Sequence, residues 1–191
     1  MARETKRELL EKGVALLLKH GYADLGLAAL LDEVGVPKGS FYHHFESKED
    51  FALQVVDLYM EQVHVALDHC LHDEALPPLA RVERFFSLVS DSYKGEGYLG
   101  CLLGGLGQEL SGVSETFRKK VEQCFSAIGK RLGACLEEAA RRGELKPGTD
   151  TRGLSELLVN CWEGAALRSR LRRNAAPLRQ MLDFYLAAVR A

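Results

Sequence analysis

The sequence lacks the features that mark several large classes of protein. Its five cysteines are widely spaced and include no C-x-x-C pair, so neither a zinc site nor a redox dithiol is expected. No apolar run is long enough to cross a membrane, and no signal peptide is evident. We therefore expect no membrane partner, and a reducing, cytoplasmic setting in which the thiols stay free.

An excess of positive charge is also missing. The formal net charge is -2 at pH 7, and residues 1–50 carry seven Lys and Arg against nine Asp and Glu. A protein that binds a polyanion through its bulk charge normally has a basic surface. Any binding to nucleic acid must therefore depend on where a few cations are placed.

Motifs of catalysis are absent as well. No nucleophile, base and orienting partner stand at a recognisable spacing, and no phosphate-binding loop is present. His43 and His44 make a poor metal site, because adjacent residues of a helix point about 100° apart. We expect no enzyme, no cofactor and no metal.

Helical periodicity dominates what is present. The five prolines lie at breaks between segments whose apolar residues recur at helical spacing, and no segment alternates with a period of two. The pattern predicts an all-α chain of about nine helices with short connections.

The stretch VPKGSFYHHFESKED, residues 36–50, has a distinctive order. Gly35 can end one helix in the left-handed conformation, and Pro37 can open the next. Phe41 and Phe45 stand one turn apart as an anchoring pair. A short helix after a tight turn, with small and polar residues outside the core, is typical of a helix-turn-helix that enters the major groove.

The residues predicted to contact DNA share small size or a hydrogen-bond donor. Small residues at a helix N-terminus let backbone amides approach phosphate, and cations and ring donors can bind phosphate or base edges. Two alternatives are that the aromatic residues are merely exposed, and that Lys48 with Glu49 forms a solvated pair. The predicted contacts are Lys38, Gly39, Ser40, Tyr42, His43 and Lys48.

The stretch GVPKGSFYHHFESKEDF resembles the DNA-binding signature of the TetR family of repressors. The resemblance implies a three-helix DNA-binding domain, placed at residues 1–46, before a larger ligand-binding and dimerisation domain at residues 47–191. It implies a transcriptional repressor that acts as a homodimer on a palindromic duplex operator and responds to an unidentified small-molecule or electrophilic effector. One departure is Gly26, where many members have Ser or Thr as a helix cap.

The larger domain is expected to hold an apolar cavity between its helices. The alternative is that the same side chains are plain core. The segment GCLLGGLGQEL is similar to the N-ethylmaleimide-responsive branch of the family, and this likeness implies that Cys101 is a sensing thiol. The alternative is that Cys101 is a buried small hydrophobe. The predicted ligand-binding residues are Tyr59, Phe86, Tyr93, Cys101 and Phe125.

The last two helical segments are predicted to form the dimer interface. Each carries a broad apolar face, and two such helices from each subunit would make a four-helix interface. The alternative is that both faces pack into the subunit's own bundle. A second reading of the whole chain is a helical ligand-binding or interaction dimer without DNA binding. The predicted interface residues are Leu158, Trp162, Ala165, Leu178, Met181, Leu182 and Tyr185.

Overall fold

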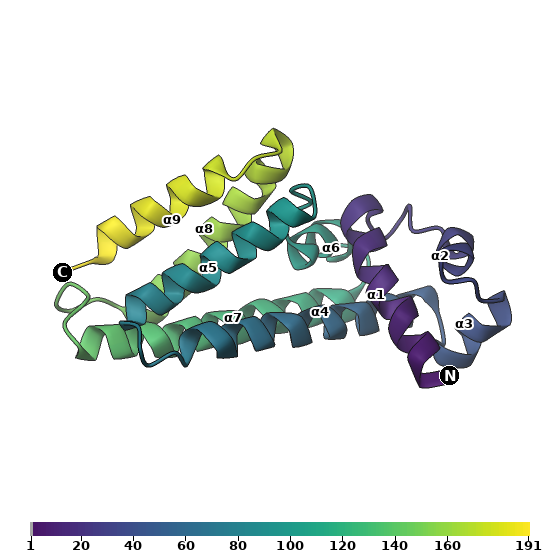
Figure 1. The fold of residues 1–191 in the computed structure, drawn as a ribbon, viewed down its shortest axis with the longest axis horizontal. Helices are drawn as coiled ribbons and strands as arrows, with labels where there is room; N and C mark the ends of the chain where they lie inside the picture. Colours follow the sequence, from purple (N-terminus) through teal and green to yellow (C-terminus); the bar gives the residue numbers. More distant parts are fainter. Residues whose placement is uncertain (1) are drawn as a thin grey trace. The chain divides into compact units, whose positions relative to one another are not determined.

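A computed structural model describes residues 2–191, and its regular elements are all α-helices (Figure 1). The only β-pairing among these residues is an isolated antiparallel bridge between Leu145 and Arg190. The all-α prediction is confirmed. The nine helices of the described chain are α1 Ala2–His20, α2 Leu27–Val34, α3 Lys38–His44, α4 Lys48–Leu71, α5 Pro78–Gly95, α6 Leu102–Leu110, α7 Glu115–Arg141, α8 Thr151–Arg172 and α9 Ala176–Val189.

The helices group into two compact units. The first, here called the head unit, runs to Gln62 and also takes in Leu102–Val121. The second, the body unit, consists of Val63–Cys101 and Glu122–Ala191. The sequence division between residues 46 and 47 stays a prediction.

The head unit is built from short helices around aromatic side chains. Phe41, Phe45 and Phe51 are buried and in mutual ring contact, with centroids 4.9 to 5.4 Å apart. α1 approaches α4 closely at Gly13, where an added Cβ would lie 2.5 Å from Cζ of Phe51. Within this unit, α1 also packs on α2 and α6. The first three helices are therefore held by apolar packing that leaves the outer side of α3 uncovered.

The body unit has a larger apolar core. α8 packs against α9, and α5 packs against α9 as well. Phe86 and Trp162 make the closest ring contact of this core, with centroids 4.5 Å apart. Tyr185 is buried and donates its hydroxyl hydrogen to the carbonyl oxygen of Leu154 at 3.0 Å. The core thus ties the last two helices to α5 within one body.

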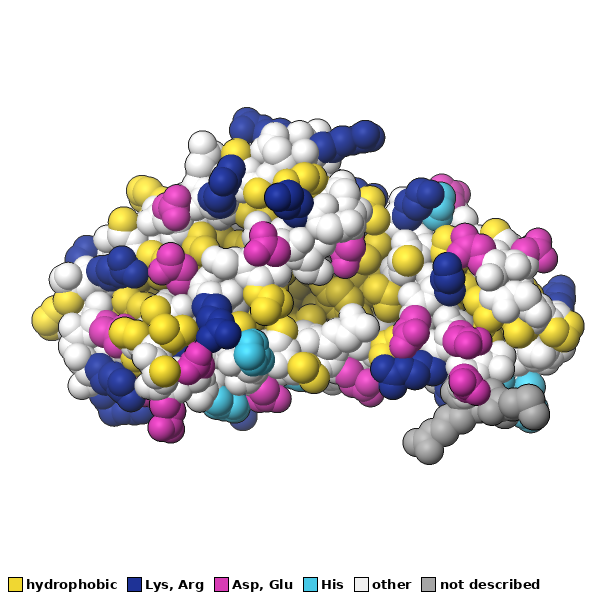
Figure 2. Space-filling model, viewed as in Figure 1, with side chains coloured by type: hydrophobic (Ala, Val, Ile, Leu, Met, Phe, Trp, Pro, Cys, Tyr) yellow, Lys and Arg dark blue, Asp and Glu magenta, His cyan; other side chains and the backbone are white. Residues whose placement is uncertain are grey.

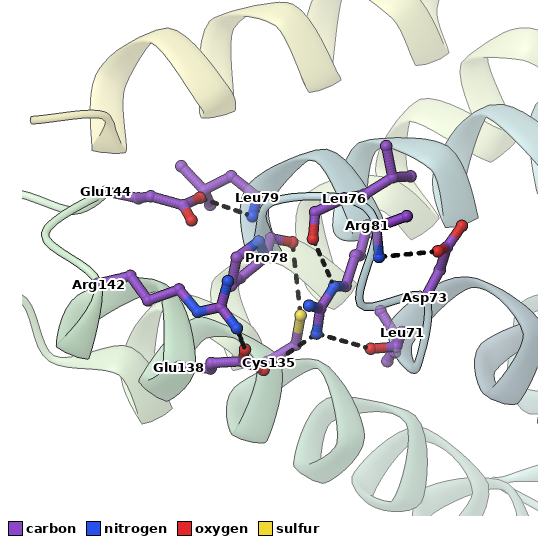
Figure 3. Close-up of polar contacts among 11 residues, drawn as sticks. Leu71, Asp73, Leu76, Pro78, Leu79, Arg81, Cys135, Glu138, Arg142 and Glu144 are labelled. Carbon is purple, nitrogen blue, oxygen red and sulfur yellow. Dashed lines mark hydrogen bonds and ion pairs between the residues drawn. The ribbon is translucent and has the colours of Figure 1, made fainter.

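A buried arginine fixes the connection between α4 and α5 (Figure 3). The guanidinium of Arg81 donates to the carbonyl oxygens of Leu76, at 2.8 Å, and Leu71, at 3.3 Å. It also pairs with the carboxylate of Glu138 at 3.1 Å. Because Leu71 is the last residue of α4, these bonds satisfy carbonyl groups that a helix end and a turn leave without partners. Arg81 is therefore a structural residue.

The visible surface carries mixed charge. Figure 2 shows acidic and basic side chains interspersed over this face, without a single-sign field. This matches the near-neutral net charge of the sequence. Among the helices of residues 2–191, none combines the length and apolar character needed to cross a bilayer.

Candidate functional site

α3 is short, and two phenylalanines anchor it. Phe41 is fully buried and Phe45 is 2% exposed. Gly35 adopts φ 72° and ends α2, and Pro37 precedes α3 with an extended backbone, as predicted. The seven residues of α3 are too few to form a stable helix alone, so packing of these rings must hold it in place.

The opposite side of α3 presents the predicted DNA contacts to solvent. Lys38, Gly39 and His43 are exposed, and Ser40 is half-buried. The Tyr42 side chain is 54% exposed, and no atom lies within 4 Å of the position that a Cβ at Gly39 would take. Five of the six predicted contacts therefore lie together on one short helix, outside the core.

Ser47 and Asp50 cap the start of α4. The backbone N–H of Asp50 donates to Oγ of Ser47 at 3.0 Å, and the N–H of Glu46 donates to the Asp50 carboxylate at 3.0 Å. These reciprocal bonds satisfy donors at the helix N-terminus. They fix the angle at which the chain leaves α3.

Lys48, the sixth predicted contact, is engaged within the chain. Its Nζ donates to the carbonyl oxygen of Ala23 at 3.3 Å and lies 4.6 Å from the ring centroid of Tyr22. Glu49 accepts a bond from Oγ of Ser114, so the alternative of a solvated Lys48–Glu49 pair does not describe these side chains. Since an ammonium group has three N–H donors, Lys48 can hold the α1–α2 loop and still reach a phosphate.

A carboxylate from α6 clamps the same loop. Glu109 accepts the backbone N–H of Tyr22 at 2.7 Å and that of Ala23 at 2.6 Å. The Tyr22 ring packs edge-on against Phe117 at a centroid distance of 5.9 Å. Sequence reasoning missed this contact, because Glu109 is 86 residues from the loop and its only signal is an acidic residue at the end of an apolar, glycine-rich helix.

Four of the five predicted ligand-binding residues belong to the body unit. Phe86 and Tyr93 are buried, and both rings contact Trp162. Cys101 and Phe125 are partly buried and pack against the same core. Tyr59 is half-buried and belongs to the head unit.

Cys101 stands directly before α6, at the end of a tight turn. Gly97, Tyr98 and Gly100 all have positive φ, a conformation that is unusual for a tyrosine. A Cβ at Gly100 would lie 3.6 Å from the carbonyl oxygen of Ala166 and 3.9 Å from Cβ of Arg170. The turn therefore lies against α8 within the body unit.

The thiol of Cys101 is hydrogen-bonded to the carboxyl group of Glu163 on α8. Burial raises the pKa of Glu163 from 4.5 to about 7, and the bond from Cys101 opposes that rise. Sequence reasoning did not single out Glu163, because a lone acidic residue in an apolar helix gives no sign of its partner.

The other four cysteines are less suited to react as thiolates. Cys70, Cys124 and Cys135 are buried, and burial raises the pKa of Cys135 to about 11 and also raises that of Cys70. Cys161 is half-buried. A thiol reacts as its thiolate, so burial makes Cys70 and Cys135 inert.

The residues predicted for the dimer interface lie in the subunit's own core. Six are between 0 and 8% exposed, and Met181 packs partly buried against the same core. The alternative of packing into the subunit's own bundle describes these side chains, since helical periodicity finds an apolar face but not what covers it. The seven are Leu158, Trp162, Ala165, Leu178, Met181, Leu182 and Tyr185.

A different apolar face of α8 and α9 is exposed. Leu157, Leu167 and Leu171 lie along one side of α8 at helical spacing, and Phe184 projects from α9 with 78% of its side chain exposed. Gly164 lies between the leucines with open space above it. This exposed face is the part of the two helices that a second molecule could cover.

Two family models match the chain. Residues 9–55 match the model for bacterial regulatory proteins of the tetR family, and residues 78–185 match that for the tetracyclin repressor-like C-terminal domain. The first covers the head helices, and the second covers most of the body unit.

Named relatives match over nearly the whole chain. The HTH-type transcriptional repressor DhaR of Mycobacterium sp. strain GP1 is 33% identical over 99% of this chain and 94% of its own. The transcriptional regulator AcuR of Cereibacter sphaeroides is 34% identical over 90% and 79%. The repressor NemR of Escherichia coli K12 is 28% identical over 94% and 90%.

Solved structures agree with these matches. The regulatory protein TetR from Rhodobacter sphaeroides has a TM-score of 0.92 at 32% identity, over 96% of this chain and 97% of its own. The reduced form of Escherichia coli NemR has a TM-score of 0.86 at 27% identity, over 97% of each chain.

Proposed function

This chain belongs to the TetR family of bacterial transcriptional regulators, which bind DNA and are not enzymes, and from that premise we propose a homodimeric repressor controlled by an electrophilic effector. Its proposed setting is the cytoplasm. The observation that carries the DNA-binding part is the outer side of α3, where Lys38, Gly39, Tyr42 and His43 face solvent on a helix fixed by two buried phenylalanines.

The contacts follow from the chemistry of these residues. Backbone amides at the start of α3 can approach a phosphate past Gly39 without a side chain between them. Lys38 supplies charge, and Tyr42 and His43 supply donors for phosphate or base edges. Lys48 is proposed as a further phosphate contact, made while it holds the α1–α2 loop.

Two α3 helices are needed to span an operator. We place the dimer interface on the exposed face of α8 and α9, formed by Leu157, Leu167, Leu171 and Phe184. A two-fold interface makes the DNA site palindromic, with half-sites about 34 Å apart or a multiple of that distance.

The effector is proposed to act on Cys101. The thiol lies beside the aromatic core that holds Phe86, Tyr93 and Trp162, and it immediately precedes α6. The far end of α6 carries Glu109, which holds the loop between α1 and α2. A change at Cys101 can thus reach the head through one helix, and the DNA affinity lost equals the effector's preference for the non-binding conformation.

The experiment compares operator binding by the wild type, Tyr42→Ala, Tyr42→Phe and Cys101→Ser. Because Tyr42 is 54% exposed, we expect its replacement to leave the fold intact. We expect Tyr42→Ala to weaken binding about tenfold, by loss of roughly 1.4 kcal/mol. Tyr42→Phe separates the hydroxyl from the ring, and His72→Ala, an exposed change in the body unit, is the control.

Cys101→Ser tests the effector. The variant should bind DNA as the wild type does and should not release it when treated with an activated alkene. Unchanged operator affinity of Tyr42→Ala contradicts the DNA contacts, and an unchanged response of Cys101→Ser contradicts the sensing role. A chain that binds no duplex at all would instead be the helical ligand-binding dimer.

A further inference from the structure

The carboxyl group of Glu163 can exchange a proton with the thiol of Cys101. Glu163 comes from α8, and Cys101 comes from the turn before α6, so the pair joins segments that are 62 residues apart. The Gly97–Gly100 turn holds the thiol at this place, because the backbone of Gly100 lies against Ala166 and Arg170, one and two turns beyond Glu163 on the same helix.

We propose that Glu163 is the proton acceptor and donor for Cys101 when the thiol adds to an α,β-unsaturated carbonyl compound. This inference rests on the proposed function, because it assumes that Cys101 is the residue that the effector modifies. Glu163 then contacts the reacting sulfur itself and is a catalytic residue of the modification, not only a positioning one.

The proposed addition needs no oxidant or reductant. The Glu163 carboxylate takes the proton from Sγ, and the sulfur forms a bond to the β carbon of the alkene. The π electrons of the double bond move toward the carbonyl group and give an enolate. Glu163 returns the proton to the α carbon, so that S–H is added across C=C and the carboxylate is restored.

The protonation state of Glu163 decides when this can happen. With a pKa of about 7, raised chiefly by burial, the carboxyl is ionised in about half of the molecules at neutral pH. A general base acts best when its pKa lies near the working pH. The thiol is therefore deprotonated more readily as the pH rises through 7, before it ionises on its own.

Other ionisable groups face this part of α8 from the elements packed on it. Tyr93 of α5 contacts Trp162, and Tyr185 of α9 donates to the Leu154 carbonyl. Arg170 of α8 lies beside Gly100. Burial raises the pKa of Tyr185 well above its usual value of 10, so it does not titrate in the same range as Glu163.

The experiment measures alkylation of Cys101 by N-ethylmaleimide, a neutral activated alkene, from pH 5.5 to 8.5. Mass spectrometry of the Cys101 peptide separates this thiol from the other four. Three proteins are compared: the wild type, Glu163→Gln, and Glu156→Gln. The last makes the same change on α8 at an exposed carboxylate whose partner is Arg152.

We expect the wild-type and Glu156→Gln rates to rise with a midpoint near pH 7. The alkylation rate of Glu163→Gln should not show this rise near pH 7. At pH 7.5 it should be at least about tenfold lower than that of the wild type, since general-base catalysis usually contributes a factor of this size or more. Glu163→Asp keeps a carboxyl group and should retain the rise at a lower rate. It serves as the second variant if Glu163→Gln folds poorly.

Two outcomes would overturn the proposal. Removing a nearby negative charge by itself favours the thiolate, so a Glu163→Gln rate equal to or above that of the wild type means that the carboxyl is not the base. If Glu156→Gln also lost the rise of the alkylation rate near pH 7, that rise could not be assigned to Glu163.

Failure of the proposed function looks different. If alkylation of Cys101 depends on Glu163 but leaves operator affinity unchanged, the proton-transfer pair stands and regulation by electrophiles does not. If alkylation releases DNA with equal rates in the wild type and in Glu163→Gln, the regulation stands and the pair does not.

Discussion

Glu163 carries a carboxyl group that folding moves out of water. Its pKa rises from 4.5 to about 7, so the folded chain holds this proton more tightly than the unfolded chain does. Below pH 4.5 the Glu163 carboxyl is protonated in both the folded and the unfolded chain, so its burial causes no pH-dependent loss of stability. As the pH rises from about 4.5 to about 7 the ionised form is favoured in the unfolded chain, and stability is lost.

Glu163→Gln removes this penalty. We expect the variant to gain thermal stability relative to the wild type as the pH is raised from 5 to 7.5, with little difference at pH 4.5. Differential scanning fluorimetry across this range measures the effect, with Glu156→Gln as the control that shows no such trend. A constant difference between the two proteins at all pH values would contradict the raised pKa of Glu163.

Local sequence order was enough to predict the structural roles of some residues, but not the long-range partners of others. Phe41, Phe45, Gly35 and Pro37 follow from spacing within a few residues, and the structure places them as predicted. The partners of Lys48, Glu109 and Cys101 come from segments far along the chain. No local pattern specifies such partners, because they depend on which helices pack together.

At the scale of elements, α6 follows Cys101 in the chain and packs on α1 of the head unit. It begins one residue after Cys101 and ends one residue after Glu109. Its carboxylate holds two backbone N–H groups of the α1–α2 loop, and Lys48 holds a carbonyl oxygen of the same loop. Two helices, α6 and α4, thus hold one loop within the head unit.

Glu109→Gln tests this clamp. A neutral amide offers only one oxygen to two N–H groups, so we expect the free energy of unfolding of the head to fall by about 1–2 kcal/mol. The release of DNA on alkylation of Cys101 should weaken as well. Chemical denaturation and operator titration measure the two effects.

The control is Glu115→Gln, an exposed residue of α7 paired with Arg118 and Lys119. Surface pairs of this kind contribute little to stability, so the stability of Glu115→Gln should stay near that of the wild type. Equal stability of both variants and a full response to alkylation in Glu109→Gln would show that the loop does not depend on Glu109.

The sequence was enough to predict which helix faces are apolar. It was not enough to predict whether each face is buried in the subunit or exposed. The periodicity of α8 and α9 identified Leu158, Trp162 and Tyr185 as one apolar side, and the structure buries that side in the subunit. Leu171 and Phe184 lie on another side that stays exposed. Each helix carries apolar side chains on more than one side, and only packing shows which of them stay exposed.

At the scale of the whole molecule, the proposed function requires two copies of the chain. Phe184 is the most exposed large side chain of the proposed interface, so replacing it by a charged residue does not disturb the subunit's core. A charge buried between two subunits without a partner is strongly unfavourable. Phe184→Asp is therefore expected to weaken dimerisation by about 100-fold or more, close to 3 kcal/mol.

Light scattering after size-exclusion chromatography measures the change. Val113→Asp serves as the matched control, because Val113 is 80% exposed between α6 and α7 and lies outside the proposed interface. The control should remain dimeric. A dimer that survives Phe184→Asp would place the interface elsewhere.

Selection of duplexes from a random library tests most directly whether α3 binds DNA as part of a two-fold dimer. The purified wild-type chain should enrich a palindromic sequence with two equivalent half-sites, and its affinity should fall steeply as salt rises. Tyr42→Ala should bind the enriched duplex about tenfold more weakly. No enrichment, an enriched site without two-fold symmetry, or equal affinity of Tyr42→Ala would contradict this assignment.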